Sequence, residues 1–421
     1  MNPQRLLPTL LAATTLVTAA FPVHAQRPVA FTGATVWDGT GAPARSADIL
    51  VRDGRIVEVG TPAIPEDAIV LDYSGKWIMP GMVEAHAHVS GYWAPDDVVY
   101  PVGRLVGDLM LYAQYGVTTV NSLGGEPPAA REVRDAQNEP SLARARLAFA
   151  GPVITAVTPA EGRAAVEENT AGGVDWMKIR VDDNLGTTQK MPWQTVGAIL
   201  EATHEDGLRL ATHLFYLDDA KRLLRMGTDL VAHSIRDAEV DEEVIELLLG
   251  AGVCYVPTLT REVSTFAYGE RPAFFDDPFF QEGAKASEVA RVSEPGFMRQ
   301  MAGSTAAARY KDALGQAQRN LKILVDAGVP VAFGTDAGPA ARFPGYFEHM
   351  ELDLMVEAGL TPEQALTSAT RVAASCLQMP DVGTLEPGKW ADLLVLGADP
   401  LADISATKTL EKVYIAGNQV R

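Results

Sequence analysis

Between residues 77 and 336 the sequence alternates short apolar runs with helix-like stretches, and this alternation restricts the fold more than any other feature. Strands that alternate with helices are typical of parallel α/β sheets. The runs number eight, and their spread over about 300 residues matches a (β/α)8 (TIM) barrel, in which chemistry takes place at the carboxyl ends of the strands. The runs are 77–88, 116–122, 146–153, 174–181, 208–215, 229–235, 252–258 and 330–336.

An open doubly wound sheet is the alternative α/β architecture. That fold would carry a Gly-x-Gly-x-x-Gly turn after a strand to hold a phosphate. No such turn follows any of the eight runs. We therefore predict the barrel.

Both ends of the chain have a different pattern, in which short β-branched runs are separated by turns. The pair Asp53-Gly54 stands between two such runs, as in a β-hairpin, and similar runs return over 391–396 and 412–420. We predict a small β-sandwich domain built from residues 26–80 and 381–421, beside a barrel over residues 81–380. An aromatic-rich insertion at about 260–310 is expected to be either a lid or partner surface, or a packed helical excursion.

The first 25 residues have the composition of a secretory signal peptide. Arg5 precedes an apolar stretch over 6–21, and Val23-His24-Ala25 has the small residues of a cleavage site. A transmembrane anchor would need about 20 apolar residues and different flanks. We expect cleavage near Ala25, a periplasmic or secreted protein, and no insertion into a membrane.

The charge and the cysteine count limit the partners and the scaffold. The formal net charge is −19 and no Lys/Arg-rich block interrupts it, so we expect a small-molecule substrate and no nucleic-acid partner. Two cysteines, Cys254 and Cys376, are too few for a disulfide scaffold. The sequence leaves open whether they form one bridge or remain two buried thiols.

Polar side chains that can bind a metal end several of the predicted strands. One histidine alone is usually structural, but these residues together offer the imidazole and carboxylate ligands that Zn²⁺ favours. His86 and His88 are two positions apart on one strand and therefore point to the same side. The sequence predicts a metal site from His86, His88, His213, His233 and Asp336. Outside this set, we expect His204 to be exposed and His349 to lie on a helix surface.

Lys178 lies among apolar residues of the fourth predicted strand. An isolated buried ammonium is costly, so an interior ion pair or an outward side chain is the simpler interpretation. The alternative is a neutral lysine that captures CO₂ and becomes a carbamate, whose two oxygens can bridge two metals.

Taken in order, these motifs resemble the amidohydrolase superfamily, and within it the branch similar to imidazolonepropionase and prolidase. The resemblance implies a centre of two divalent metal ions, expected to be zinc. It places His86, His88 and Asp336 on one ion and His213 and His233 on the other, with carboxylated Lys178 and a hydroxide between them. It also implies a homo-oligomer. The segments that carry it are 80–88, 116–120, 176–179, the two single-histidine strands, 334–338 and 383–393.

The resemblance further implies a hydrolytic mechanism. The bridging hydroxide attacks an amide carbonyl, Asp336 shuttles the proton to the leaving nitrogen, and His233 helps to polarise the carbonyl. A peptide-like or N-acyl amino acid substrate is expected. The same site could instead hydrolyse an ester, a lactone, a phosphotriester or a cyclic amidine. A non-catalytic binding barrel is disfavoured because no expected ligand is missing, and no Gly-x-Ser-x-Gly motif supports a serine nucleophile.

Candidate substrate-binding residues follow the predicted strands. An arginine among them could hold a substrate carboxylate in a bidentate way, or it could pair with an acid on a neighbouring loop. The sequence departs from the prolidase-like branch at Asn121-Ser122, where an Arg-Asp pair is usual, and at 157–160, where Gly-Gly-His-Gly is usual. Dipeptidase specificity therefore does not follow from these motifs. The candidates are Tyr92, Arg180, Tyr216, Arg236 and Arg261.

Overall fold

The computed structural model describes residues 27–421. The predicted signal peptide, residues 1–25, lies outside the described residues. Within 27–421, none of the helices combines the length and the apolar character that crossing a bilayer requires.

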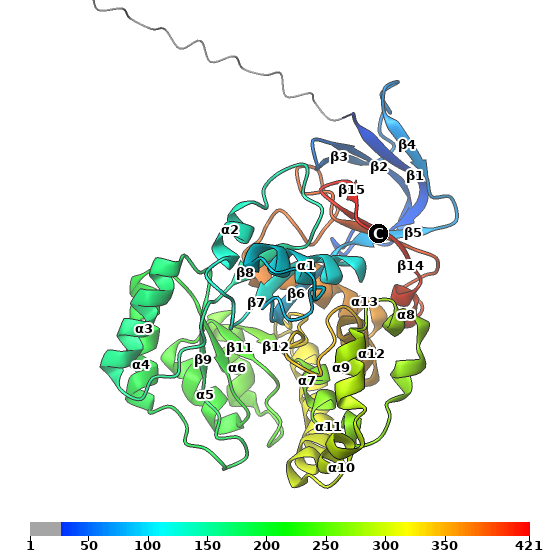
Figure 1. The fold of residues 1–421 in the computed structure, drawn as a ribbon. Helices are drawn as coiled ribbons and strands as arrows, with labels where there is room; N and C mark the ends of the chain where they lie inside the picture. Colours follow the sequence, from blue (N-terminus) through cyan, green and yellow to red (C-terminus); the bar gives the residue numbers. More distant parts are fainter. Residues whose placement is uncertain (1–26) are drawn as a thin grey trace, which may run out of the picture.

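Strands from both ends of the chain form one sheet, drawn in blue and red in Figure 1. Its centre is β5, which pairs with β1 in parallel and with β13 in antiparallel orientation. All eight strands belong to this single sheet, so the two-sheet sandwich stays a prediction. The strands are β1 (Val29–Val36), β2 (Arg45–Arg52), β3 (Arg55–Gly60), β4 (Ile69–Asp72), β5 (Trp77–Pro80), β13 (Leu393–Leu396), β14 (Leu410–Ile415) and β15 (Asn418–Gln419).

The middle of the chain is an α/β structure with two parallel sheets. Each strand lies inside a run predicted from the sequence, although the run 77–88 divides at Gly81 into β5 and β6, which belong to different sheets. One sheet contains β6 (Met82–Ala87), β7 (Val117–Ser122) and β8 (Arg146–Phe149). The other contains β9 (Met177–Arg180), β10 (Leu210–His213), β11 (Leu230–Ala232) and β12 (Cys254–Val256).

The eighth predicted strand, 330–336, is not a regular strand. It makes one isolated bridge, from Val331 to Tyr255 of β12, while the amide of Ala85 in β6 donates to Phe333 O at 2.9 Å. The ladder is interrupted because the carboxylate of Glu84 accepts the N–H of Thr335, and Asp336 has a φ of 60°. The segment nevertheless lies between β12 and β6. A second isolated bridge, Ile154 to Ile179, connects the other edges of the two sheets.

Helices follow the parallel strands and cover them (Figure 1). Side-chain caps define several of their first turns, for example Thr158, which forms a capping box with Glu161. The helices before the predicted insertion are α1 (Pro101–Gln114), α2 (Ala130–Asp135), α3 (Pro159–Gly172), α4 (Trp193–Glu205), α5 (Leu217–Met226) and α6 (Glu242–Ala251). Those after it are α12 (Tyr346–Glu357), α13 (Pro362–Thr367) and α14 (Ala373–Cys376).

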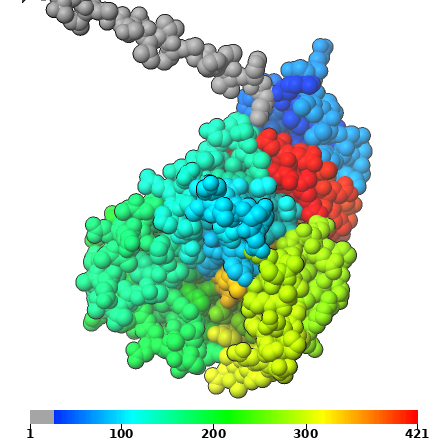
Figure 2. Space-filling model, in the orientation of Figure 1, coloured from blue at the N-terminus to red at the C-terminus, as the bar shows by residue number. Residues whose placement is uncertain are grey.

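The segment after β12 is a series of short helices packed through aromatic side chains. Phe275 and Phe280 are buried, and the Phe280 ring lies 4.9 Å from that of Phe343. In Figure 2 this yellow-green segment borders a hollow, at whose bottom orange atoms from around residue 340 are visible. Its α-helices are α7 (Leu259–Ser264), α8 (Pro278–Gln281), α9 (Ala286–Val292), α10 (Pro295–Ala302) and α11 (Thr305–Asp326).

Two buried connections hold the parts of the chain together. A disulfide joins Cys254 of β12 to Cys376 of α14, which answers the question that the sequence left open. Between the parallel strands and the terminal sheet, Arg146 Nε lies 2.9 Å from Asp392 Oδ2, and both side chains are buried.

Candidate active site

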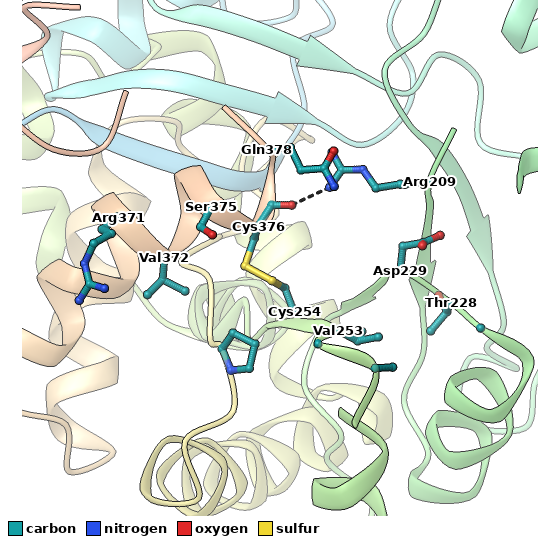
Figure 3. A pocket seen from close by; sticks show the side chains of 14 residues that line it. Arg209, Thr228, Asp229, Val253, Cys254, Arg371, Val372, Ser375, Cys376 and Gln378 are labelled. Atoms are coloured by element: carbon teal, nitrogen blue, oxygen red, sulfur yellow. Dashed lines mark hydrogen bonds between the residues drawn. A yellow bond between two sulfur atoms is a disulfide. The ribbon is translucent and has the colours of Figure 1, made fainter. Parts of the chain in front are cut away.

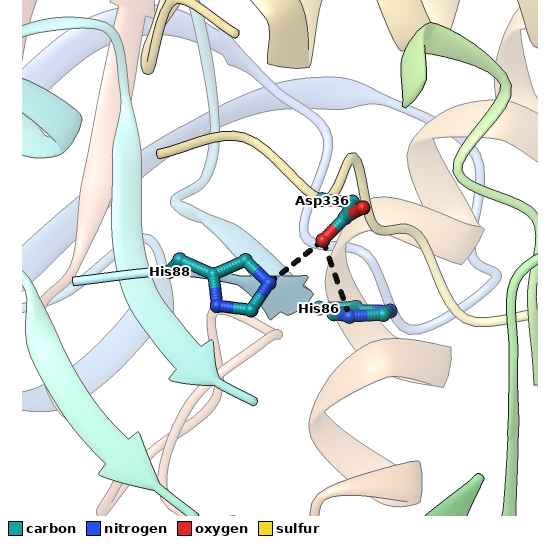
Figure 4. A group of neighbouring side chains, drawn as sticks. All are labelled: His86, His88 and Asp336. Atoms are coloured by element: carbon teal, nitrogen blue, oxygen red, sulfur yellow. Dashed lines mark hydrogen bonds and ion pairs between the residues drawn. The ribbon is translucent and has the colours of Figure 1, made fainter. Parts of the chain in front are cut away.

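Three of the predicted ligands converge at the carboxyl end of β6. The ligand atoms of His86, His88 and Asp336 all lie within 4.8 Å of one another (Figure 4). Asp336 Oδ1 is 2.7 Å from His88 Nε2 and 3.5 Å from His86 Nε2. Glu84 fixes the two backbones that carry them, because its Oε1 accepts the N–H groups of His86 and Thr335 at 2.8 and 3.1 Å.

Lys178 points into the same site from β9. Its Nζ lies 3.0 Å from His86 Nε2, and the side chain is buried. It forms no ion pair with any carboxylate of residues 27–421, so both the interior ion pair and the outward side chain are wrong. Burial lowers the pKa of Lys178 to about 7. A substantial fraction of the amine is therefore neutral near pH 7, as reaction with CO₂ requires.

His213 and His233 complete the group. Their ring centroids are 4.3 Å apart, and the His233 ring lies 4.6 Å from that of His86. His233 and Asp336 both have positive φ angles, 77° and 60°. Non-glycine residues adopt this conformation rarely, and such strain is concentrated at functional sites. The structure thus brings all six predicted metal ligands together.

One ring nitrogen is engaged by a neighbour in three of the four histidines. His88 Nδ1 lies 2.6 Å from Gly124 O, His213 Nε2 lies 2.9 Å from Asp182 Oδ2, and His233 Nδ1 lies 2.8 Å from Thr258 Oγ1. Holding one ring nitrogen in this way turns the other toward the group, as is typical of metal-binding histidines, and His88 Nε2 faces Asp336 Oδ1 there at 2.7 Å.

The protonation states also suit a metal. Burial is the main cause that lowers the pKa values of His86, His213 and His233, to about 3 for His213. These imidazoles are therefore neutral at pH 7, which is the form that binds a cation. Four imidazoles, one carboxylate and one neutral amine form a donor set that fits divalent cations such as Zn²⁺.

A sequence comparison now places the chain among known proteins. The model of the amidohydrolase family matches residues 77–420, which is more than half of the chain. The protein belongs to the amidohydrolase family. As a family member it is a hydrolase that acts on C–N bonds of small molecules, and the family is generally metal-dependent.

Curated relatives and solved structures agree with this assignment. The chain is 27% identical to an imidazolonepropionase of Deinococcus radiodurans over 400 residues, which cover 89% of this chain and 92% of that one. A candidate prolidase from Bifidobacterium longum has a TM-score of 0.74 at 26% identity, covering 93% and 94% of the two chains. A Xaa-Pro dipeptidase crystallised with methionine in its active site has a TM-score of 0.73 at 23% identity, covering 93% and 99%.

The five candidate substrate-binding residues of this amidohydrolase all have acidic partners. Tyr92 and Tyr216 donate to Glu288 and Asp183, each at 2.7 Å. Arg180 lies 3.4 Å from Asp182. Arg236 and Arg261 are buried and share Glu262 Oε1, at 2.9 and 2.8 Å. The arginines therefore pair with acids, as the alternative expected. Only Asp182 is in a loop, since Glu262 belongs to α7, where two guanidinium groups surround one carboxylate.

Sequence reasoning missed two residues of the site. Asp182 forms a hydrogen bond with His213. The only sequence feature that could have indicated this role is its position just beyond β9. Arg342 donates to Asp336 Oδ2, and no motif pointed to it. The prediction for His349 was wrong, because its ring is buried between Thr407 Oγ1, 3.0 Å away, and Tyr115 O, 2.8 Å away. His204 is exposed, as predicted.

A cavity of about 760 Å³ lies away from these residues (Figure 3). Arg209, Asp229 and Val253 line it, and they immediately precede β10, β11 and β12. The cavity is therefore at the amino ends of the strands, where it contacts the disulfide, whereas the histidines are at the carboxyl ends. It does not belong to the candidate active site.

Proposed function

We propose that the protein is a binuclear metal-dependent amidohydrolase that cleaves an amide bond in a peptide-like or N-acyl amino acid substrate. The observation that carries the proposal is the convergence of four imidazoles, Asp336 and the buried Lys178 amine. His86, His88 and Asp336 would hold one divalent cation, His213 and His233 the other, and carboxylated Lys178 would bridge them; zinc is the expected metal. We also propose that the two parallel sheets and segment 331–336 form a (β/α)8 barrel.

The residues of the chain divide the chemistry between them. Bound cations of this type polarise a carbonyl and lower the pKa of water. Burial would raise the pKa of Asp336, but Arg342, His88 and His86 hold it well below the ordinary value. Ionised Asp336 can accept the proton of the attacking water and pass it to the leaving nitrogen. His233, whose Nδ1 is engaged by Thr258, has only Nε2 left for the group and would help to polarise the scissile carbonyl through the cation that it holds.

A second candidate function keeps the site and changes the bond. The match to imidazolonepropionases extends over 89% of the chain, which favours a cyclic amidine over the ester, lactone and phosphotriester alternatives. We further propose that the protein is exported to the periplasm or secreted and acts as a homo-oligomer. The disulfide supports export, because disulfides persist mainly in oxidising compartments.

Metal analysis and a substrate panel test the proposal. We expect about two metal ions per chain, loss of activity with a chelator, and hydrolysis within a panel of dipeptides and N-acyl amino acids. Lys178→Ala should lose at least one ion, whereas Lys311→Ala, an exposed lysine on α11, should keep both. Full activity of a metal-free preparation would contradict the proposal. A metal-loaded protein that cleaves only cyclic amidines would support the second candidate.

A further inference from the structure

Arg342 contacts the candidate proton shuttle directly. It follows segment 331–336 and donates from Nη1 to Asp336 Oδ2, while its Nε lies 3.2 Å from Ser264 Oγ. Its Nη2 has no hydrogen-bond acceptor within residues 27–421. The side chain is 19% exposed, so this free donor can reach a ligand.

This ion pair conflicts with the role of Asp336. Its Oδ1 faces His88 Nε2 at 2.7 Å and His86 Nε2 at 3.5 Å, in the predicted metal group. Its Oδ2 is the oxygen left to accept a proton, and Arg342 occupies it. With Arg342 on Oδ2 and the two histidines on Oδ1, both carboxylate oxygens are engaged, so a displacement of Arg342 would expose Oδ2.

Arg342 lies near a second group of charged side chains, formed by Arg236, Arg261 and Glu262. Ser264 Oγ accepts a hydrogen bond from Arg342 Nε and donates one to Arg261 O at 2.6 Å. Arg342 is therefore bound to the helix that carries Arg261, α7. Arg236 and Arg261 share the single carboxylate of Glu262. Within residues 27–421, Arg236 Nη2, Arg261 Nε and Glu262 Oε2 are buried without a hydrogen-bond partner. The two unpaired arginine N–H groups are donors that suit an anionic group, whereas Glu262 Oε2 is an unpaired acceptor.

A buried apolar cluster adjoins these charges. Phe215, Tyr310 and Ala313 form a small buried cluster, with Tyr216 packed against it. The guanidinium of Arg236 lies 4.5 Å from the ring centre of Phe215, and that of Arg261 lies 5.0 Å from that of Tyr310. A ligand with a carboxylate next to an apolar side chain matches both features.

We propose that Arg342 selects substrates that carry a carboxylate, by leaving Asp336 to bind it. Arg261 is the second anchor of the carboxylate, and the apolar cluster holds the adjacent side chain. Asp336 Oδ2 is then free to take a proton from the water whose oxygen bonds to the carbonyl carbon, and it passes that proton to the leaving nitrogen as the C–N bond breaks. The inference rests on the proposed function, and Arg342 acts as a specificity-determining residue without taking part in bond making.

A matched pair of substrates tests the inference. N-acetyl-L-phenylalanine and N-acetyl-2-phenylethylamine differ only in the carboxylate. The wild type should prefer the acid, and R342M should lower kcat/KM for the acid by about 10- to 100-fold, the usual effect of losing a charged hydrogen bond. R342M should also hydrolyse the amine derivative faster than the wild type, because Asp336 Oδ2 is released. A purely structural role for Arg342 would not raise any rate.

Control variants separate this role from damage to the fold. R342K keeps the positive charge but lacks the planar guanidinium that can bind a carboxylate with two hydrogen bonds. It should retain part of the preference for the acid substrate. R319M, on an exposed part of α11, should retain all of it, and the metal content of all variants should equal that of the wild type. An equal loss on both substrates, or a wild type without preference, would overturn the inference.

Ligand binding keeps the inference testable if the proposed amide hydrolysis fails. The metal-loaded wild type should bind 3-phenylpropanoate more tightly than 3-phenylpropanamide in calorimetry, and R342M should lose that difference. If R342M binds the carboxylate as tightly as the wild type does, Arg342 is not its receptor and the inference is wrong.

Discussion

His213 donates through Nε2 to Oδ2 of Asp182 across 2.9 Å, which makes Nδ1 the ring nitrogen available to a metal. Burial would raise the pKa of Asp182, but His213 holds it well below its usual range. A permanently ionised carboxylate of this kind fixes both the tautomer and the orientation of a metal-binding imidazole. The site therefore depends on a residue that binds neither metal nor substrate.

Asp182→Ala should weaken metal binding by about 10- to 100-fold, the range typical for loss of such a partner. The reason is that His213 would lose the acceptor that selects its tautomer. Metal retained at graded chelator concentrations measures the effect. Asp183→Ala is the matched control, because Asp183 bonds Tyr216 and has no contact with His213. Equal chelator sensitivity of Asp182→Ala and wild type would show that the pair does not orient the ligand.

The grouping of the predicted metal ligands could be anticipated because it depends on strand periodicity. Histidines two apart on one strand share a face, and strand ends meet at one edge, so the residues that end β6, β10 and β11 had to lie near one another. Lys178 is different: burial and charge favoured an ion pair, and only the family resemblance indicated a bridging ligand.

Residues on loops could not be placed in the same way. Asp182 and Arg342 lie beyond the ends of extended segments, and their partners depend on loop backbone that has no period. The sequence predicted a regular eighth strand over 330–336, and nothing in it indicated that the Glu84 side chain would share the N–H of Thr335 with His86 O. His349 has polar neighbours in the sequence, but the 404–408 turn covers it, a contact between segments far apart in the chain.

The stability of the fold should fall as the pH rises through about 7, because of Glu348. Burial raises the pKa of this carboxyl to about 7. The pKa of Glu348 is thus higher in the folded protein than in the unfolded chain, where it is near 4.5. Its contribution to the free energy of unfolding is fully present below pH 4.5 and is lost as the pH rises through 7. The loss is on the order of 3 kcal/mol for one such group. Urea unfolding of the wild type and Glu348→Gln between pH 5 and pH 8 measures it.

Glu348→Gln should gain stability relative to the wild type across that pH range, since the amide cannot ionise. Its two polar atoms can still reach Thr335 Oγ1 and Gly345 N, the present partners of Glu348. Glu357→Gln, an exposed position on the same helix, should show no such gain. Parallel stability curves for Glu348→Gln and wild type would mean that Glu348 does not titrate near pH 7.

Reduction of the disulfide should destabilise the protein. Cys254 and Cys376 are 122 positions apart, so the bridge closes a long loop in the unfolded chain. Removing such a bridge typically costs about 2–5 kcal/mol. Thermal unfolding with and without dithiothreitol measures the effect, and the double variant Cys254→Ala/Cys376→Ala should not respond to the reductant. An unchanged wild-type Tm after complete reduction would refute the prediction.

Arg146 should be the most sensitive contact between the parallel strands and the terminal sheet. Its Nε lies 2.9 Å from Asp392 Oδ2, both side chains are at most 3% exposed, and Trp390 stacks 4.3 Å from the guanidinium. Arg146→Met leaves a buried carboxylate unpaired, which typically costs about 3–5 kcal/mol.

The double variant Arg146→Met/Asp392→Asn should recover part of that loss, because the amide carries no charge and can still accept from Ala416 N. Arg163→Met is the matched control, since it breaks an exposed pair with Glu201 and should cost no more than about 1 kcal/mol. Denaturant unfolding of the three variants gives the comparison. If Arg146→Met lowers the free energy of unfolding no more than Arg163→Met does, the buried ion pair does not stabilise this contact. The apolar packing around Trp390 would then have to hold the parallel strands against the terminal sheet.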